Sequence, residues 1–325
     1  AGIQQWTQDK FGLAATPVVA ETWDGRLNDL GGFHIQPADA VAAIEAARAG
    51  PVVEGNVGGG TGMVCFGFKG GIGTASRKVT VAGKEYTVGV LVQCNTGDRQ
   101  TLRIAGAPVG PELSNSWLPC YDAALSLPER LPKCAGDGAA AGKTPRAAAA
   151  GQTSPGAAAG KKPRAAAAGQ TLPVAAAGKA SSFGGAVGQT PPDVGSIIIV
   201  VATDAPLMPV QLNRVARRAA LGLGRLGSYS GNGSGDLIVS FTTATVAAND
   251  PDQRHPSALT PLPSEQLDYL FKGVVDATEE SVVNALVAAQ TMTGADSHRF
   301  YGLQHPQLRM ILKHYGRLEG GVHAP

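Results

Sequence analysis

The hydrophobic and polar positions divide the chain into segments of strand-like and helix-like pattern. The run 196–203 (SIIIVVAT) is continuously apolar and β-branched, which is typical of a strand buried on both faces. Strands are also expected at 61–68, 78–81, 86–93 and 236–243. Apolar residues at helical spacing predict helices at 37–49 and 209–223. Over 264–290 they predict either one helix or two helices with a break near Gly273.

The order of these elements indicates the fold class. Helices and strands alternate loosely, with neither a regular βαβα rhythm nor an all-β pattern. This favours a layered α/β (α+β) fold with mixed sheets.

A compositional change interrupts the pattern between residues 136 and 193. This segment is rich in Ala, Gly and Pro, and Pro145–Thr153 recurs as Pro163–Thr171. It has few large apolar side chains whose burial would offset the entropy of ordering it. We therefore predict a low-complexity linker over 136–193 between two parts of the fold, 1–135 and 196–325.

Composition and charge exclude several classes of protein. The 325 residues are 43% hydrophobic and carry a formal net charge of +2, which gives no global electrostatic case for binding nucleic acid or an anionic membrane. The longest apolar run, Ile197–Ala202, is too short to span a bilayer. Residues 1–5 lack the pattern of a signal peptide. We expect neither a transmembrane protein nor a secretory precursor.

The four cysteines are scattered. Cys65, Cys94, Cys120 and Cys134 form no Cys-x-x-Cys motif, and no histidine lies at zinc-finger spacing from them. In a chain of this length the pattern favours buried thiols in a reducing compartment, with a Cys120–Cys134 disulfide as the alternative. No metal site is expected.

The peptide bond between Gly195 and Ser196 lies where the linker meets the buried strand. If that bond were cleaved, Ser196 would carry a hydroxyl and a free α-amine on one residue. The amine has a reference pKa of about 7.7–8.0, so it can act as general base to the hydroxyl. The alternative is a plain boundary between linker and strand.

Two polar segments could assist such a nucleophile. In the loop before the 236–243 strand, Ser234 and Asp236 are two residues apart and share one side of an extended chain. Asn95 follows the 86–93 strand, where its amide could donate to an oxyanion. The alternatives are a tight turn and an ordinary turn at the end of a strand.

Two glycine-containing segments resemble nucleotide-binding loops only superficially. The segment 54–63 does not match Gly-x-Gly-x-x-Gly, and the element before it is predicted to be a helix. Gly142-Lys143-Thr144 lacks the first glycine of a P-loop and the strand that should precede it. We expect close backbone packing or a turn at 54–63, and no nucleotide site.

Several sequence blocks together resemble a known family. They include AETWDGRLND (20–29), EGNVGGGTGM (54–63), YTVGVLVQCN (86–95), GSIIIVVATDAPL (195–207) and GNGSGD (231–236). Their content and order are similar to those of the DmpA-type L-aminopeptidase/D-esterase family, which includes the β-peptidyl aminopeptidases. The resemblance implies an αββα four-layer sandwich like that of N-terminal nucleophile hydrolases, here shortened at the N-terminus. It also implies a precursor that cuts itself between Gly195 and Ser196.

The resemblance also implies roles for individual residues. Ser196 matches the nucleophile, whose freed amine would be the base. Asn95 matches the oxyanion-hole amide, and Ser234 and Asp236 match the pair that orients the amine and hydroxyl of the nucleophile.

Two further positions match substrate-binding residues of the family. Glu21 matches a carboxylate that, in relatives cleaving β-peptides, holds the free ammonium of the substrate. Trp23 falls where other relatives carry a catalytic Tyr, and an indole can donate a hydrogen bond but cannot transfer a phenolic proton.

The resulting hypothesis is a self-processing serine aminopeptidase that forms an acyl-enzyme on Ser196 and acts on short peptides, amino-acid amides or esters. It implies no metal or organic cofactor, a homotetramer of cleaved chains, and a start within the α chain of the family, which would leave a sheet edge open. The alternatives are a non-catalytic truncated paralogue serving as a binding partner, and an N-acyl transferase. We expect a cytoplasmic location, or a periplasmic one if an upstream leader was removed.

Overall fold

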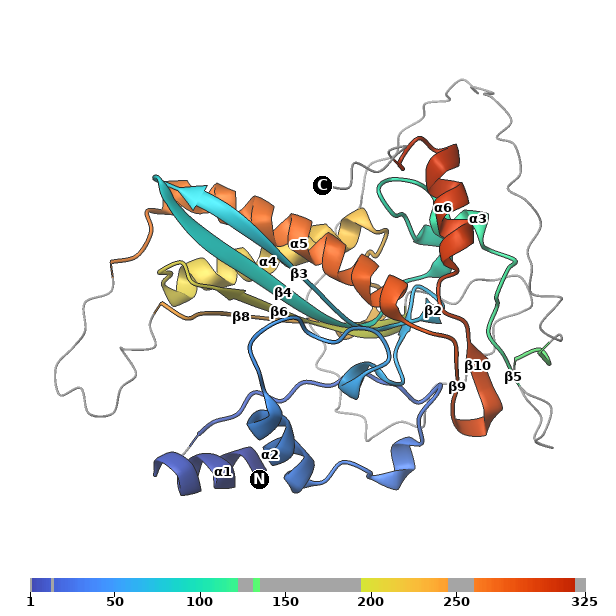
Figure 1. Cartoon of the computed structure of the whole chain (residues 1–325), viewed down its shortest axis with the longest axis horizontal. Helices are drawn as coiled ribbons and strands as arrows, with labels where there is room; N and C mark the ends of the chain where they lie inside the picture. The colour runs from blue at the N-terminus through green and yellow to red at the C-terminus, as the bar shows by residue number, and fades with distance from the viewer. Residues whose placement is uncertain (1, 13–14, 122–130, 135–193, 245–259, 319–325) are drawn as a thin grey trace, which may run out of the picture.

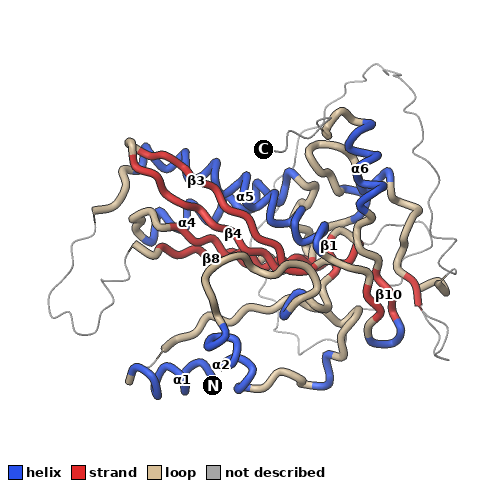
Figure 2. The backbone as a smooth tube through the Cα atoms, in the orientation of Figure 1, coloured by secondary structure: helices blue, strands red, loops and turns tan. Residues whose placement is uncertain are grey.

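The computed structural model describes residues 2–12, 15–121, 131–134, 194–244 and 260–318, so the predicted linker lies outside the described residues. Figures 1 and 2 show the arrangement of its helices and strands. The helices are α1 (Gly2–Phe11), α2 (Pro37–Ala46), α3 (Val109–Glu112), α4 (Pro209–Arg225), α5 (Leu267–Ala288) and α6 (His305–His314). The strands are β1 (Val64–Cys65), β2 (Phe68–Lys69), β3 (Gly71–Val81), β4 (Lys84–Asn95), β5 (Cys120–Tyr121), β6 (Val194–Thr203), β7 (Gly233–Ser234), β8 (Leu237–Thr242), β9 (Met292–Thr293) and β10 (His298–Phe300).

The largest sheet is mixed, as the sequence predicts. Its order is β3-β4-β6, and both β7 and β8 pair with β6. The β3–β4 and β4–β6 pairs are antiparallel, whereas β7 and β8 run parallel to β6. Along this edge of β6 the strand pairing is therefore interrupted at residues 235 and 236, between β7 and β8.

Helices α4 and α5 pack side by side on one face of this sheet, while α1 and α2 contact each other in a separate part of the molecule (Figure 1). The core lies between the sheet and these two helices. Buried members include Val88, Val92, Ile197, Ile199, Val215, Leu223, Leu270, Val274 and Leu286. Together α4, α5 and the sheet supply one helical and one sheet layer of the expected sandwich.

Helix α5 is continuous, so of the two alternatives the single helix is confirmed and there is no break near Gly273. A Cβ at Gly273 would lie 3.1 Å from Val79 Cγ1 of β3. The glycine therefore serves close packing between helix and sheet rather than ending the helix.

The single strand predicted at 61–68 is also wrong, because the structure forms a short hairpin there. Strands β1 and β2 are separated by Phe66 and Gly67, whose φ angles are +48° and +70°. Two left-handed residues in succession reverse the chain tightly, as in two-residue hairpin turns. The remaining strand expectations are met, with β3 and β4 longer than predicted.

All four cysteines are paired, so the expectation of buried thiols is wrong. Cys65 bonds to Cys94, with 5.5 Å between their Cα atoms, and Cys120 bonds to Cys134, with 4.9 Å. The second pair is the alternative considered from the sequence. The first joins cysteines 29 positions apart, because the β1–β2 hairpin lies against the end of β4.

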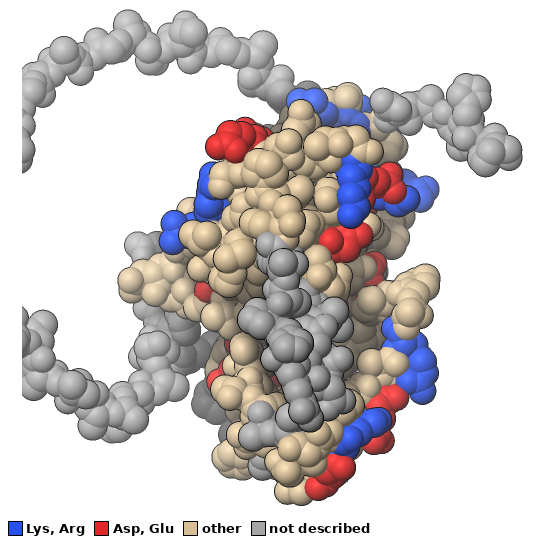
Figure 3. All heavy atoms as spheres, turned by 90° about the vertical axis from the view of Figure 1, so that its left-hand side faces the viewer, with Lys and Arg blue, Asp and Glu red and all other residues tan. Residues whose placement is uncertain are grey.

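The charged side chains on the surface are of both signs, as the small net charge predicts. On the face shown in Figure 3, acidic and basic side chains lie in small groups of mixed sign. No helix in the described part of the chain has both the length and the apolarity needed to cross a membrane.

Candidate active site

Ser196 and Asn95 lie directly opposite each other in the sheet. They are paired in the antiparallel register of β4 and β6. Side chains alternate between the two faces of a strand. One face of the sheet is covered by α5, because Gly73 of β3 closely approaches the α5 backbone at Ser281 and Ala285. The neighbours of Ser196 and Asn95, Ile197 and Cys94, are fully buried on the helix-covered face. Ser196 and Asn95 therefore project from the opposite face.

The interruption between β7 and β8 lies beside Ser196. The Gly235 N–H donates to the Gly195 carbonyl oxygen at 3.1 Å and to Ser196 Oγ at 3.3 Å. One backbone donor thus contacts both the carbonyl of the predicted scissile bond and the predicted nucleophile. Strand β6 begins at Val194, so this bond lies within a strand rather than at its start.

Ser234 and Asp236 face each other across Gly235, as the i, i+2 spacing predicts. The Ser234 hydroxyl donates to Asp236 Oδ1 at 2.6 Å, and the Ile197 N–H donates to the same oxygen at 3.3 Å. Asp236 Oδ2 is buried and accepts no hydrogen bond from any described residue. Beside them, Thr96 Oγ1 lies 3.3 Å from Ser234 Oγ.

Both ends of the Asn95 amide are engaged. Its Oδ1 accepts from the Val64 N–H at 2.8 Å, and its Nδ2 donates to the Trp23 carbonyl oxygen at 2.7 Å. The residue is 5% exposed. These partners fix which end of the amide is the donor, and the second Nδ2 hydrogen is available to another acceptor.

Trp23 lies at the edge of this cluster, and Glu21 precedes it by two residues. Trp23 contributes its backbone carbonyl, while its side chain is 54% exposed. Glu21 is also exposed and takes no part in the hydrogen bonds that join Ser196, Asn95, Ser234 and Asp236. The adjacent Thr22 is buried and accepts from Gln93 Nε2 at 2.8 Å, which places the 20–24 segment against the end of β4.

A buried lysine next to the site was missed by the sequence analysis. Lys69 is fully buried, and its ammonium donates to the carbonyl oxygens of Gly60 at 3.1 Å, Met63 at 2.8 Å and Gly70 at 2.7 Å. Burial lowers the pKa of Lys69 to about 7, and the negative charge of Asp24 partly opposes this shift. The signal available in the sequence was a lysine inside the apolar and glycine-rich run 64–73.

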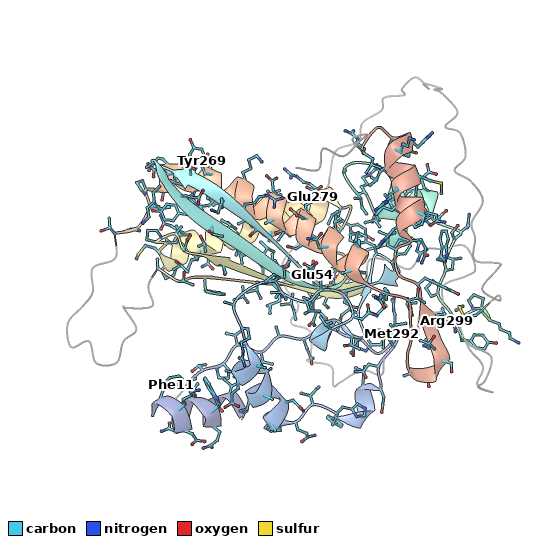
Figure 4. All side chains as sticks on the ribbon, viewed as in Figure 1. Phe11, Glu54, Tyr269, Glu279, Met292 and Arg299 are labelled. Carbon is cyan, nitrogen blue, oxygen red and sulfur yellow. A yellow bond between two sulfur atoms is a disulfide. The ribbon has the colours of Figure 1, made fainter. Side chains whose placement is uncertain are left out.

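The glycine-rich segment 54–63 serves close backbone packing, as expected. Gly55 pairs with Ile72 of β3, and a Cβ at Gly71 would lie 2.1 Å from the Gly55 carbonyl oxygen. Glu54, labelled in Figure 4, accepts from both the backbone N–H and the hydroxyl of Thr74 at 2.7 Å. The segment thereby covers part of the outer edge of β3.

The cluster as a whole is suited to acyl transfer. It combines a hydroxyl on Ser196, an oriented amide on Asn95, a backbone donor on Gly235 and a carboxylate on Asp236. A nucleophile, donors for an oxyanion and a group that orients a base are the components that acyl transfer through a covalent intermediate requires.

Comparison with known proteins gives consistent matches. The model of peptidase family S58 matches residues 2–300. A curated protein named β-peptidyl aminopeptidase BapA, from Sphingosinicella microcystinivorans, is 45% identical over 303 residues, which cover 93% of this chain and 62% of that protein. A second protein of that name, from Sphingosinicella xenopeptidilytica, is 43% identical over 297 residues, covering 91% and 60%. The chain thus spans about 60% of the length of these relatives.

A solved structure gives the corresponding match in three dimensions. It is the L-aminopeptidase D-Ala-esterase/amidase from Ochrobactrum anthropi, described as a prototype of the serine aminopeptidases and a variant of the Ntn hydrolase fold. The TM-score is 0.69 at 35% sequence identity, and the match covers 98% of this chain and 70% of that one. The expected fold class, an α/β sandwich of the Ntn hydrolase type, is confirmed.

Proposed function

Because this chain belongs to peptidase family S58, we propose that it is a self-processing serine aminopeptidase. Ser196 is the nucleophile, and it becomes competent for turnover when the Gly195–Ser196 bond is cut. The observation that carries the proposal is the pairing of Ser196 with Asn95 across β4 and β6, with Asp236 bonded to the next backbone N–H.

Self-cleavage would begin with attack of Ser196 Oγ on the Gly195 carbonyl carbon. The Gly235 N–H already donates to that carbonyl oxygen and would stabilise the negative charge that develops on it. As the intermediate collapses, the C–N bond breaks and the proton of Oγ passes to the Ser196 nitrogen, which leaves an ester on Ser196 Oγ and a free α-amine. Water then hydrolyses the ester and releases residues 1–195 from residues 196–325.

The freed amine would lie beside Asp236. The Ile197 N–H already bonds Asp236 Oδ1, while Oδ2 is buried without a partner among the described residues. Because a buried unpaired carboxylate oxygen is costly, the amine of Ser196 is a favourable donor for it. The carboxylate and the Ser234 hydroxyl would then orient the amine as base toward its own hydroxyl.

Turnover would repeat the same chemistry on an external substrate. The Ser196 amine takes the proton of Oγ as Oγ attacks the substrate carbonyl, and the protonated amine then protonates the leaving group. Asn95 Nδ2 donates to the oxyanion, and water resolves the acyl-enzyme. We propose amino-acid amides, esters and short peptides as substrates, with Glu21 receiving their free ammonium and Trp23 lining the entrance.

The proposal extends to assembly and location. We propose that the cleaved chains form homo-oligomers. Two disulfides favour an oxidising compartment, so of the two locations considered we propose the periplasm rather than the cytoplasm.

The deciding experiment is the intact mass of the purified protein under denaturing conditions, with N-terminal sequencing. We expect two chains, one of which begins Ser-Ile-Ile-Ile, and release of the amine from amino-acid amides. The Ser196→Ala variant is the control and stays as one chain of 33.0 kDa. A wild-type chain that stays intact and inactive would instead support the non-catalytic paralogue, whereas cleavage with transfer of the acyl group to amines would support the transferase.

A further inference from the structure

The β1–β2 hairpin is fastened to the end of β4 by three successive links. The Val64 N–H donates to Asn95 Oδ1 at 2.8 Å, and the Phe66 N–H donates to the Thr96 carbonyl oxygen at 2.7 Å. Between these two hydrogen bonds lies the Cys65–Cys94 disulfide. Both cysteines are fully buried, so the covalent link lies inside the core and next to the site.

The Val64 N–H and the Trp23 carbonyl oxygen together orient the Asn95 amide. A backbone N–H bonds only to an acceptor, so it selects the Asn95 oxygen and leaves the Nδ2 end as donor. If Val64 moved away, only the Trp23 carbonyl oxygen would hold the amide, and the amide could rotate and exchange its oxygen and nitrogen ends more easily. The donor required opposite Ser196 would then be lost for part of the time.

We propose that the Cys65–Cys94 disulfide is a positioning element for the Asn95 amide. Cys65 follows Val64, which carries the donor N–H, and Cys94 precedes Asn95, which carries the acceptor. The disulfide therefore holds the two residues of that hydrogen bond next to each other. The inference rests on the proposed function for its effect on turnover, but its structural part concerns Asn95 alone.

A purely stabilising role is the alternative explanation. A disulfide restricts the unfolded chain and stabilises the fold wherever it lies. The Cys120–Cys134 disulfide provides a matched control, because it joins a different part of the chain, where Cys120 Sγ lies 3.6 Å from the Tyr301 hydroxyl. Removing either disulfide lowers the temperature of unfolding, whereas only the Cys65–Cys94 disulfide is expected to affect Asn95.

The first test compares the double variants Cys65→Ala/Cys94→Ala and Cys120→Ala/Cys134→Ala with alanine p-nitroanilide as substrate. Loss of the first pair lowers kcat per cleaved chain by about tenfold to a hundredfold with KM nearly unchanged, because the amide acts on the transition state. Loss of the second pair leaves both parameters within about twofold, as expected for a remote site. When Asn95→Ala is also present, loss of the first pair has no further effect on kcat. An unchanged kcat, or an equal loss with and without Asn95, would overturn the proposal.

The second test needs no enzymatic activity. The side-chain amide resonances of Asn95 are identified in a ¹⁵N spectrum by their absence in Asn95→Ala. We expect them to shift and to exchange faster with solvent in Cys65→Ala/Cys94→Ala but not in Cys120→Ala/Cys134→Ala. Unchanged resonances would refute the positioning role even in an active enzyme. Altered resonances in a protein without turnover would support it while refuting the proposed function.

A third measurement tests the proposal if the Cys65→Ala/Cys94→Ala variant does not fold. In Cys120→Ala/Cys134→Ala only the Cys65–Cys94 disulfide remains, so a phosphine reductant acts on it alone. The phosphine is oxidised to its oxide with an oxygen atom from water, and the disulfide is reduced to two thiols. The same change in the Asn95 resonances is expected after reduction of the folded protein, and its absence would contradict the proposal.

Discussion

At the scale of single residues, the position of Asp236 suggests that its charge matters more than its shape. Its Oδ1 accepts from Ser234 and Ile197, while Oδ2 is buried without a partner among the described residues. The Asp236→Asn variant keeps the size of the side chain but removes the negative charge that would stabilise the Ser196 nitrogen as it gains a proton and leaves as an amine. We expect self-cleavage to slow by about a hundredfold, within the usual range for loss of acid–base assistance.

The rate is measured as the fraction of uncut chain over time after refolding from urea. Asp204→Asn is the matched control, because the Asp204 carboxylate accepts from the Thr87 N–H near the far end of β6. It should cleave at the wild-type rate. Wild-type cleavage by Asp236→Asn would show that the carboxylate charge has no part in the step.

Lys69 predicts a pH dependence of stability. Burial lowers its pKa to about 7 in the folded chain, whereas an unfolded lysine has a pKa of about 10.4. Between these values the unfolded chain binds more protons than the folded one. Lys69 therefore makes the free energy of unfolding rise with pH between these two pKa values, by up to about 1.4 kcal/mol per pH unit. Well below pH 7, Lys69 does not contribute to the pH dependence of the free energy of unfolding.

Urea unfolding at pH 6.5, 8 and 9.5 tests this, in the Ser196→Ala background so that the chain stays intact. The Lys69→Met variant should be less stable overall, because three carbonyl oxygens lose their donor. The decisive quantity is the slope with pH, which should be smaller in Lys69→Met than in its parent. Equal slopes would mean that Lys69 keeps an ordinary pKa.

The sequence predicted side chains of the site better than backbone groups. The i, i+2 spacing brought Ser234 and Asp236 together, and the resemblance selected Ser196 and Asn95. The N–H groups of Gly235 and Val64 were missed, because every residue except proline carries such a group and only the fold decides which are free to act. Glu21 was carried over by resemblance alone, and its role stays a prediction.

At the scale of elements, the contact between β3 and α5 depends on glycine. A Cβ at Gly73 would lie 2.0 Å from the Ser281 carbonyl oxygen and 2.5 Å from the Ala285 N, both backbone atoms of α5. Because neither atom can move without shifting the helix, Gly73→Ala should lower the free energy of unfolding by about 1–3 kcal/mol. Gly89→Ala is the matched control in the same sheet.

At Gly89 the nearest atom to a new Cβ is 4.0 Å away, so this substitution should change stability by less than about 1 kcal/mol. Both variants are compared by urea unfolding in the Ser196→Ala background. A Gly73→Ala variant as stable as Gly89→Ala would show that α5 can move away from β3 at little cost.

Elements with a strong local pattern were predicted well. Strand β6 is a continuous β-branched run, and α4 has an apolar stripe at helical spacing, so their own residues determine them. The wrong strand at 61–68 and the choice left open near Gly273 have a common cause. There the backbone conformation is set by tertiary packing, which overrides the local preference of the residues.

At the scale of the whole molecule, the site is assembled from both sides of the Gly195–Ser196 bond. Asn95 and Val64 come from the N-terminal part, whereas Ser196, Ser234 and Asp236 come from the C-terminal part. The sequence could indicate each part but not their pairing, because the β4–β6 register joins residues about a hundred positions apart. The Cys65–Cys94 pairing was missed for the same reason.

All four cysteines precede Gly195, so neither disulfide crosses the bond proposed to be cut. After scission the two products would be held together by non-covalent contacts, which include the β4–β6 and β5–β10 ladders and the core. Refolding of the mature protein would then be a second-order reaction that slows on dilution, whereas folding of the precursor is first order. The two products of one chain would behave as an obligate heterodimer whose subunits folded together before the bond between them was cut.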